Sequence, residues 1–227
     1  MTRPESTALR WWRPALVVTL AALAVVWRLV RADLGAPPNL ELVTAATFAA
    51  TTLLRSRWAF VVPLAVTVVS DVVLGNTAIA LFTWSAWLVV GLGSLLARNT
   101  TGWRRVGAGA AFGVAGSLWF FAWTNFGVWL QGRGVWYPAG ADGLFASYVA
   151  GLPFLRTMLL GNLVLVPLVA AGTLLVDRLE ASHGMVGARA VPAAVAWFVP
   201  GGARAEPATG STGAGGGHPW RDTGSSA

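Results

Sequence analysis

The chain has 227 residues, of which 56% are hydrophobic and only 11% are charged, and its mean hydropathy is +0.63. Soluble domains carry about 25% charged residues, so this composition predicts an integral membrane protein. The chain contains neither cysteine nor lysine, which excludes disulfides, thiol chemistry, a phosphate-binding P-loop and a lysine Schiff base. The net charge of +7 comes from arginine, and we attribute it to contact with anionic membrane lipid rather than with nucleic acid.

Three apolar runs occupy the first third of the chain. The first, residues 14–30, follows a polar segment, residues 1–13, that we predict to be cytoplasmic. A cleaved signal peptide is the alternative, but arginines follow this run instead of a small-residue cleavage site. The second run, residues 40–54, is rich in Ala and Thr and is short for the ~20 residues that a spanning helix needs. The third run covers residues 58–75.

Three further apolar runs follow, over residues 78–97, 106–130 and 152–176. Between the last two, apolar side chains at helical spacing within residues 141–150 predict a short helix lying in the membrane interface. Gly, Ser, Thr and Pro dominate the end of the chain, which predicts a disordered cytoplasmic tail over residues 181–227. The predicted fold is therefore an all-α, six-helix transmembrane bundle over residues 14–180.

The arginines predict the orientation of this bundle, because cytoplasmic loops carry an excess of basic residues. With six spans, both termini lie on the same side of the membrane. The arginines on that side are Arg3, Arg10, Arg13, Arg55, Arg57, Arg98, Arg104, Arg105, Arg178 and Arg189, and those on the other side are Arg28, Arg31, Arg133 and Arg156. We therefore predict a multi-pass protein of the cell (inner or plasma) membrane, with both termini in the cytoplasm.

Costly polar side chains gather at one predicted depth, the outer third of the membrane. Glu41 is near the outer start of the second span, and Asp71 lies about four residues, or ~6 Å, below the outer end of the third. Asn125 lies just below the outer end of the fifth span, and Asn162 lies in the outer part of the sixth. Intramembrane polar groups commonly mark a functional site, so their shared depth predicts that something polar is bound there.

Each of these residues also has a purely structural interpretation. Asp71 has two candidate arginine partners, Arg28 and Arg156, with which an ion pair would hold helices together. The two asparagines would then serve as interhelical hydrogen bonds, worth about 0.6–2 kcal/mol each. Glu41 would cap the N-terminus of its helix. In the connection after the fifth span, Trp136 and Tyr137 would belong to the aromatic belt of the membrane interface.

The sequence offers no catalytic constellation, and we predict neither an enzyme nor a bound cofactor or metal. Both histidines, His183 and His218, follow the last predicted span. Asp71 has no second carboxylate three or four residues away with which to hold a metal, and no nucleotide-binding motif is present. A transporter of this kind would take its energy from a partner or from an ion gradient.

Several short motifs resemble those of one bacterial family. They are Pro38-Asn39 before a short Ala-rich span, Ser70-Asp71 with Leu74-Gly75, Thr124-Asn125-Phe126-Gly127-Val128-Trp129, Tyr148 with Leu152-Pro153-Phe154, and Leu160-Gly161-Asn162. Over roughly residues 25–177 the chain resembles a bacterial family of uncharacterised transport proteins, which is itself similar to the substrate-binding S components of energy-coupling-factor (ECF) transporters.

The resemblance implies a six-helix bundle that holds a small molecule, often a vitamin, near the outer face under loop lids. It also implies docking on a membrane scaffold subunit that carries two cytoplasmic ATPases. S components dock through small residues of their first helix, whereas here the clearest small-residue pairs, Ala45/Ala49 and Ala46/Ala50, fall on the second span.

The leading prediction is a membrane-embedded substrate-binding subunit of a small-molecule or vitamin importer. Asp71, Asn125 and Asn162 would line the site, with Glu41 at its mouth. Residues 131–151 would form a lid, in which Trp136 and Tyr137 stack on the ligand or close over it. The alternative is a non-catalytic integral membrane scaffold protein of the cell envelope.

Overall fold

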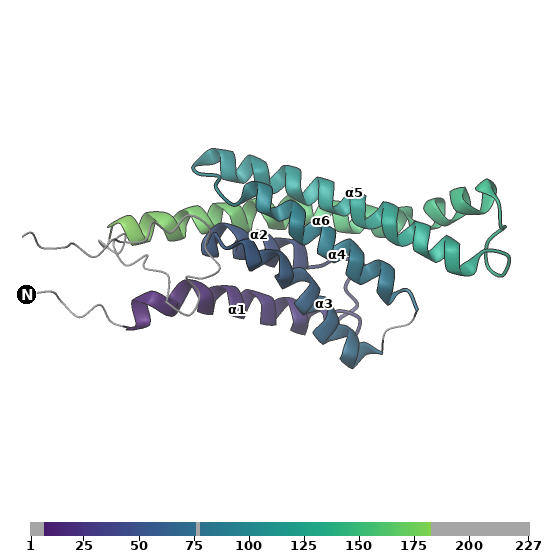
Figure 1. The fold of residues 1–227 in the computed structure, drawn as a ribbon, viewed down its shortest axis with the longest axis horizontal. Coiled ribbons are helices and arrows are strands. Elements are labelled where there is room, and N and C mark those ends of the chain that lie inside the picture. Colours follow the sequence, from purple (N-terminus) through teal and green to yellow (C-terminus); the bar gives the residue numbers. More distant parts are fainter. Residues whose placement is uncertain (1–6, 76–77, 183–227) are drawn as a thin grey trace, which may run out of the picture.

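The computed structural model describes residues 7–75 and 78–182, and over these residues the protein is all-α. The elements in chain order are α1 (Thr7–Val30), α2 (Val43–Leu54), the 3-10 turn η1 (Arg57–Phe60), α3 (Val61–Leu74), α4 (Ala80–Ser94), the 3-10 turn η2 (Leu95–Ala97), α5 (Trp103–Gly132) and α6 (Ala141–Ser182). The six α-helices match the six predicted apolar runs. Successive helices run in opposite directions along one long axis (Figure 1).

Helix α2 is the centre of the bundle rather than one of its walls. It has only 12 residues, about 18 Å at 1.5 Å per residue, which is too short to cross the ~30 Å hydrocarbon layer. All of its residues except Leu54 are buried. Its Ala and Thr side chains are small enough for the other helices to approach closely, and Thr47 and Thr52 donate their hydroxyls to backbone carbonyls of α2 itself. The small-residue pairs at Ala45/Ala49 and Ala46/Ala50 are therefore core contacts and form no docking surface.

The other five helical segments are long and apolar enough to cross a membrane. The third combines η1 with α3, and Pro63 lies in the first turn of α3, where its missing N–H breaks no helical hydrogen bond. Gly91 of α4 packs directly on η1, since a Cβ at this position would lie 2.1 Å from the carbonyl oxygen of Phe60. In the described part of the chain, the predicted six-span bundle is thus six α-helices, of which all but α2 belong to segments of spanning length.

Helices α5 and α6 form a long hairpin that projects beyond α3 and α4 at the end opposite the termini (Figure 1). The prediction of a separate interfacial helix over residues 141–150 is wrong, because α6 runs without interruption from Ala141 to Ser182. The segment packs on α5 instead of lying in the interface. Ser147 donates to the carbonyl of Asn125 at 2.9 Å, and Tyr148 donates to the carbonyl of Ala122 at 3.0 Å.

The predicted lid over residues 131–151 is also wrong in extent. Residues 131 and 132 end α5, residues 141–151 belong to α6, and only residues 133–140 connect the two helices. At the other end of the bundle, hereafter the terminal end, α1 begins beside the end of α6. Helix α1 starts at Thr7, inside the predicted N-terminal segment. The predicted tail lies outside the described residues, apart from its first two, which end α6.

Candidate functional site

One polar seam joins α1, α3 and α4 around Asp71. The Arg28 guanidinium contacts Asp71 Oδ1 at 2.6 Å and donates to Ser70 Oγ at 2.6 Å, and Trp84 Nε1 donates to Asp71 Oδ2 at 2.8 Å. Asp71 is 6% exposed, so this ion pair is largely removed from solvent. Of the two arginines that the sequence offered as partners, Arg28 is the one in contact, whereas Arg156 is exposed on α6.

A second polar seam joins the start of α2 to α5 and α6. The buried Glu41 carboxylate accepts from the Thr44 backbone N–H at 2.9 Å and from the Thr44 hydroxyl, so Glu41 does cap α2. Asn162 Nδ2 donates to Thr44 Oγ1 at 3.2 Å and to Ser117 Oγ at 3.1 Å. Glu41 and Asn162 both contact Thr44, and the Asn162 side chain also interacts with the Glu41 carboxyl group. We call Glu41, Thr44, Ser117 and Asn162 the Glu41–Asn162 seam.

This seam contains a buried hydrogen-bond acceptor without a donor among the described residues. Glu41 forms no ion pair among the described residues, although buried carboxylates are ordinarily paired. The Asn162 side chain is only 1% exposed, and its Oδ1 has no donor in the described part of the chain. Trp87 Nε1 is a buried donor without an acceptor there, and Trp87 shares a core cluster with Val43 and Met158, which neighbour this seam along the chain. An unsatisfied buried polar group costs about 1–3 kcal/mol, so these atoms call for an explanation.

The end of α1 connects the two seams. Trp27 Nε1 donates to the carbonyl of Leu40 at 2.8 Å, which fixes the turn that precedes Glu41. Burial lowers the pKa of the Arg31 guanidinium, the charge of Arg28 lowers it further, and the Glu41 carboxylate raises it. Arg31 thus lies within electrostatic reach of a charged member of each seam.

The other predicted site residues lie elsewhere, in the α5–α6 hairpin. Asn125 donates to the carbonyl of Phe121 in its own helix at 2.8 Å, and its side chain packs on Gly151 of α6. Trp136 is 75% exposed and leans on Gly132, and Tyr137 is half-buried in the same turn. Among the described residues, no hydrogen bond connects these three residues with Glu41 or Asn162. The predicted site residues therefore lie in three separate places: the seam around Asp71, the Glu41–Asn162 seam and the α5–α6 hairpin.

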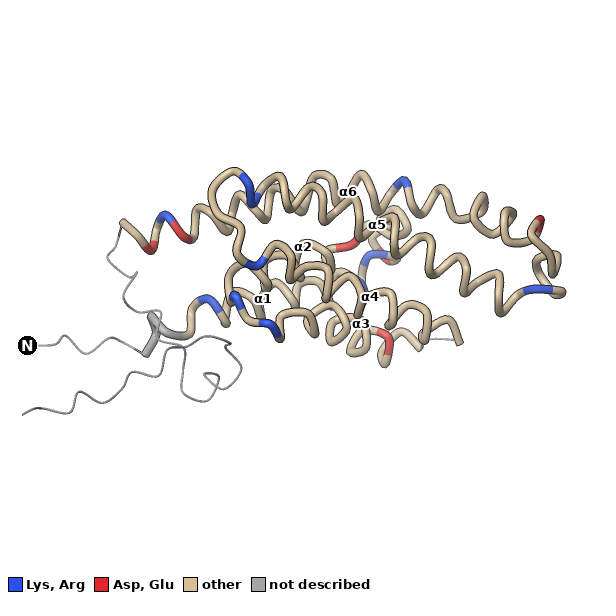
Figure 2. Tube along the Cα trace, turned by 45° about the horizontal axis from the view of Figure 1, so that its top comes forward, with Lys and Arg blue, Asp and Glu red and all other residues tan. Residues whose placement is uncertain are grey.

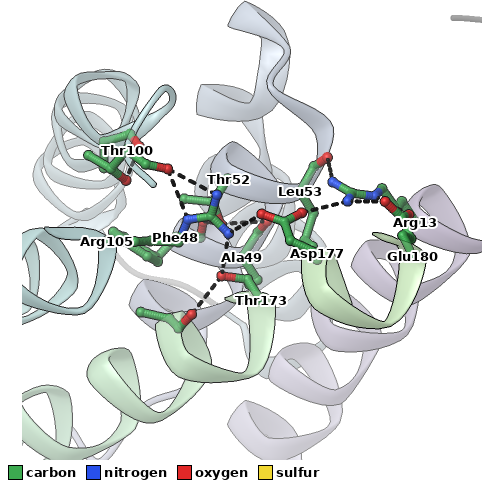
Figure 3. Close-up of polar contacts among 12 residues, drawn as sticks. Arg13, Phe48, Ala49, Thr52, Leu53, Thr100, Arg105, Thr173, Asp177 and Glu180 are labelled. Atoms are coloured by element: carbon green, nitrogen blue, oxygen red, sulfur yellow. Dashed lines mark hydrogen bonds and ion pairs between the residues drawn. The ribbon is translucent and has the colours of Figure 1, made fainter. Parts of the chain in front are cut away.

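A charged network closes the terminal end of the bundle (Figure 3). Arg105, fully buried, contacts Asp177 at 2.9 Å and donates to the carbonyl of Thr100. Arg13 bridges Asp177 and Glu180, both through bonds of about 2.6 Å or less, and donates to the carbonyl of Leu53. The network ties α1, α2, α5 and α6 together and neutralises its own charge.

Arg105 was expected among the loop arginines, and that expectation is wrong. The residue lies in the first turn of α5 and points into the bundle, while Arg104 is exposed. Figure 2 shows charged residues at both ends of the molecule and also midway along its long axis, with long uncharged stretches of helix between them. Sequence reasoning missed this network because periodicity alone does not say which of two adjacent arginines faces the core.

These features define an all-α, multi-pass membrane protein with a buried polar seam around Asp71, a second one about midway along α5 and α6, and a charged network at the terminal end. Residues 7–183 match the family described as "Family of unknown function (DUF6580)", and the chain belongs to this family. No curated protein and no solved structure matches the chain. The family match does not extend to the S components that the motifs resemble.

Proposed function

We propose that this protein is a membrane-embedded, substrate-binding subunit of a small-molecule importer, similar to an S component, and that its substrate binds at the Glu41–Asn162 seam. The observation that carries this proposal is the Asn162 carbonyl, buried without a donor beside a carboxylate that has no ion-pair partner. If these polar groups served only to hold the helices together, they would form hydrogen bonds with one another, or apolar side chains would stand in their place. A substrate that supplies donors would complete them.

The chemistry of the seam favours a small substrate with a cationic or N–H-bearing group. Glu41 would accept a charge-assisted hydrogen bond from it, and Asn162 Oδ1 would accept a second bond. Trp87 Nε1 offers a donor to an acceptor atom of the same molecule. Asp71 already has its partners, so in this proposal it positions α1 rather than touching the substrate.

Access would come from the α1–α2 connection rather than from the hairpin turn. Residues 31–40 lie directly before Glu41, and beyond the backbone hydrogen bonds that follow the end of α1, an indole-to-carbonyl bond from Trp27 to Leu40 ties them to α1. Displacing this connection would open the seam without unpacking the α5–α6 hairpin. Trp136 and Tyr137 would then contact the interface or a partner and not the substrate.

The proposed importer also needs partners. The chain carries no nucleotide-binding motif, so ATP-driven import would require a separate membrane scaffold subunit with cytoplasmic ATPases. Both termini are proposed to be cytoplasmic, on the distribution of arginines. The charged network at the terminal end would then face the side from which such ATPases act.

A screen for thermal stabilisation tests the proposal. The purified full chain is screened against vitamins and small amines, and a ligand present at a hundred times its Kd adds about 2.7 kcal/mol of stability. Glu41→Gln and Asn162→Ala should abolish the stabilisation by that ligand, whereas Asp142→Asn, at the exposed start of α6, should leave it unchanged. If the ligand stabilised the wild type and the three variants equally, the seam would not be its binding site.

One observation favours the alternative function, a scaffold of the cell envelope. The projecting tip of the hairpin exposes large apolar side chains, with Val135 78% and Phe145 70% exposed, and such patches often bind other proteins. A scaffold predicts that Val135→Ser with Phe145→Ser disrupts association with envelope proteins, while no small ligand stabilises the chain. An importer subunit instead predicts that a small ligand stabilises the chain.

A further inference from the structure

An apolar groove runs along the outside of the bundle between α4 and α5, apart from both polar seams. Its volume is about 480 Å³, within the range of small-molecule sites. Small residues form its floor: Gly93 and Ala97 on one side, and Ala108, Ala111 and Ala115 on the other. Its rim is exposed, with Leu96 90% and Val89 42% accessible, so the groove opens toward the surrounding membrane.

The groove has the length of one membrane leaflet. On α5 it extends from Ala108 to Trp119, eleven residues or roughly 16 Å, and half of the hydrocarbon layer is about 15 Å. Ala108, Ala111, Ala115 and Trp119 recur at the spacing that puts residues on one helix face. The groove therefore lies in the leaflet of the terminal end and stops near the middle of the membrane.

Two arginines without ion-pair partners among the described residues lie where this groove opens toward the terminal end of the bundle. Arg98 directly follows η2, whose last residue lines the groove, and Arg104 lies one turn before Ala108 on the same face of α5. Neither guanidinium has an ion pair or a side-chain hydrogen bond among the described residues, in contrast to the neighbouring Arg105. Trp103, 77% exposed, lies at the same level, where an indole suits the boundary between tails and headgroups.

From this arrangement we propose a binding site for an anionic phospholipid. One acyl chain lies in the groove, and the phosphate is held by Arg98 and Arg104. Guanidinium groups bind phosphate oxygens through paired hydrogen bonds, and basic pockets between membrane helices select anionic headgroups. The predicted cytoplasmic leaflet, where this site would lie, is the one enriched in such lipids. The site is independent of the proposed substrate seam.

The purified full chain in zwitterionic detergent provides the test, with phosphatidylglycerol as the probe and phosphatidylcholine as the headgroup control. Native mass spectrometry gives the affinity of each lipid. Phosphatidylglycerol should bind the wild type at least tenfold more tightly than phosphatidylcholine. The double variant Arg98→Gln/Arg104→Gln should weaken phosphatidylglycerol about thirtyfold, the effect of two arginines near an anionic surface. The matched double variant Arg133→Gln/Arg156→Gln, which removes two exposed arginines of the predicted outer side, should leave binding unchanged.

A second variant tests the groove separately from the charges. Ala111→Leu fills the floor at a position exposed to the membrane, so folding should be retained while the acyl chain is excluded and phosphatidylglycerol binding falls at least tenfold. Equal affinity for the two lipids would overturn the proposal, as would equal losses in the two double variants. The proposal would also fail if Ala111→Leu left lipid binding intact but dissociated a dimer, since a second copy of the chain would then cover the groove.

Discussion

Replacing Asn162 by leucine separates binding from stability in this protein. The substitution keeps the branched shape of the side chain but removes its two hydrogen bonds, to Thr44 at 3.2 Å and to Ser117 at 3.1 Å. Both hydroxyls keep another partner, because Thr44 also donates to Glu41 and Ser117 also donates to the carbonyl of Gly113. At about 0.6 kcal/mol for each interhelical bond in a membrane, the loss is about 1.2 kcal/mol.

The same substitution removes the unsatisfied Asn162 carbonyl, which costs about 1–3 kcal/mol in the wild type. The ligand-free Asn162→Leu protein should therefore be as stable as the wild type or up to about 2 kcal/mol more stable, while it loses ligand binding. Reversible unfolding in detergent measures the difference, with Asn99→Leu, at an exposed position, as the control. A destabilisation above about 2 kcal/mol would refute the reasoning, because Asn162 would then serve mainly to hold α2, α5 and α6 together.

Two further predictions test the packing on which the site depends. Arg105→Met leaves the partly exposed Asp177 still paired with Arg13, but it removes a fully buried guanidinium and the donor to the Thr100 carbonyl, so it should cost about 1–3 kcal/mol of unfolding free energy. Arg178→Met, on the exposed face of α6, should change the unfolding free energy by less than about 0.5 kcal/mol. Gly91→Ala drives a methyl group into the backbone carbonyl of Phe60 and should lower the thermal midpoint strongly, whereas Gly172→Ala, with open space around it, should stabilise α6 by about 0.5–1 kcal/mol. Similar midpoints for the two alanine variants would contradict the described contact between α4 and η1.

The main features of the fold could be predicted from the sequence because the membrane imposes long apolar helices. The six apolar runs and the antiparallel order both follow from composition and spacing. The burial of α2 could not be predicted, because a short helix rich in Ala and Thr has no amphipathic pattern. Its sequence therefore does not show whether it lies in the core of the bundle or on its outside. The continuity of α6 through Gly151 and Pro153 was missed because these residues commonly break soluble helices, whereas here packing on α5 supports the helix.

The candidate site was predictable in part. The sequence singles out Glu41, Asp71 and Asn162 because a charge or an amide in an apolar span stands out in composition, and their role in binding stays a prediction. Depth along the chain does not give the angle around a helix, so the sequence could not say that Asp71 and Asn162 face different neighbours. Thr44 and Ser117 carry hardly any signal of their own, since membrane helices often contain hydroxyls bonded to the preceding turn.

A structure of the protein with a stabilising ligand tests the central claim most directly. The account predicts a donor atom of the ligand within hydrogen-bonding distance of both Asn162 Oδ1 and the Glu41 carboxylate, with residues 31–40 displaced from their present course. A ligand bound at another place, with Asn162 Oδ1 still unpaired and α2 still packed against α5 and α6, would contradict it.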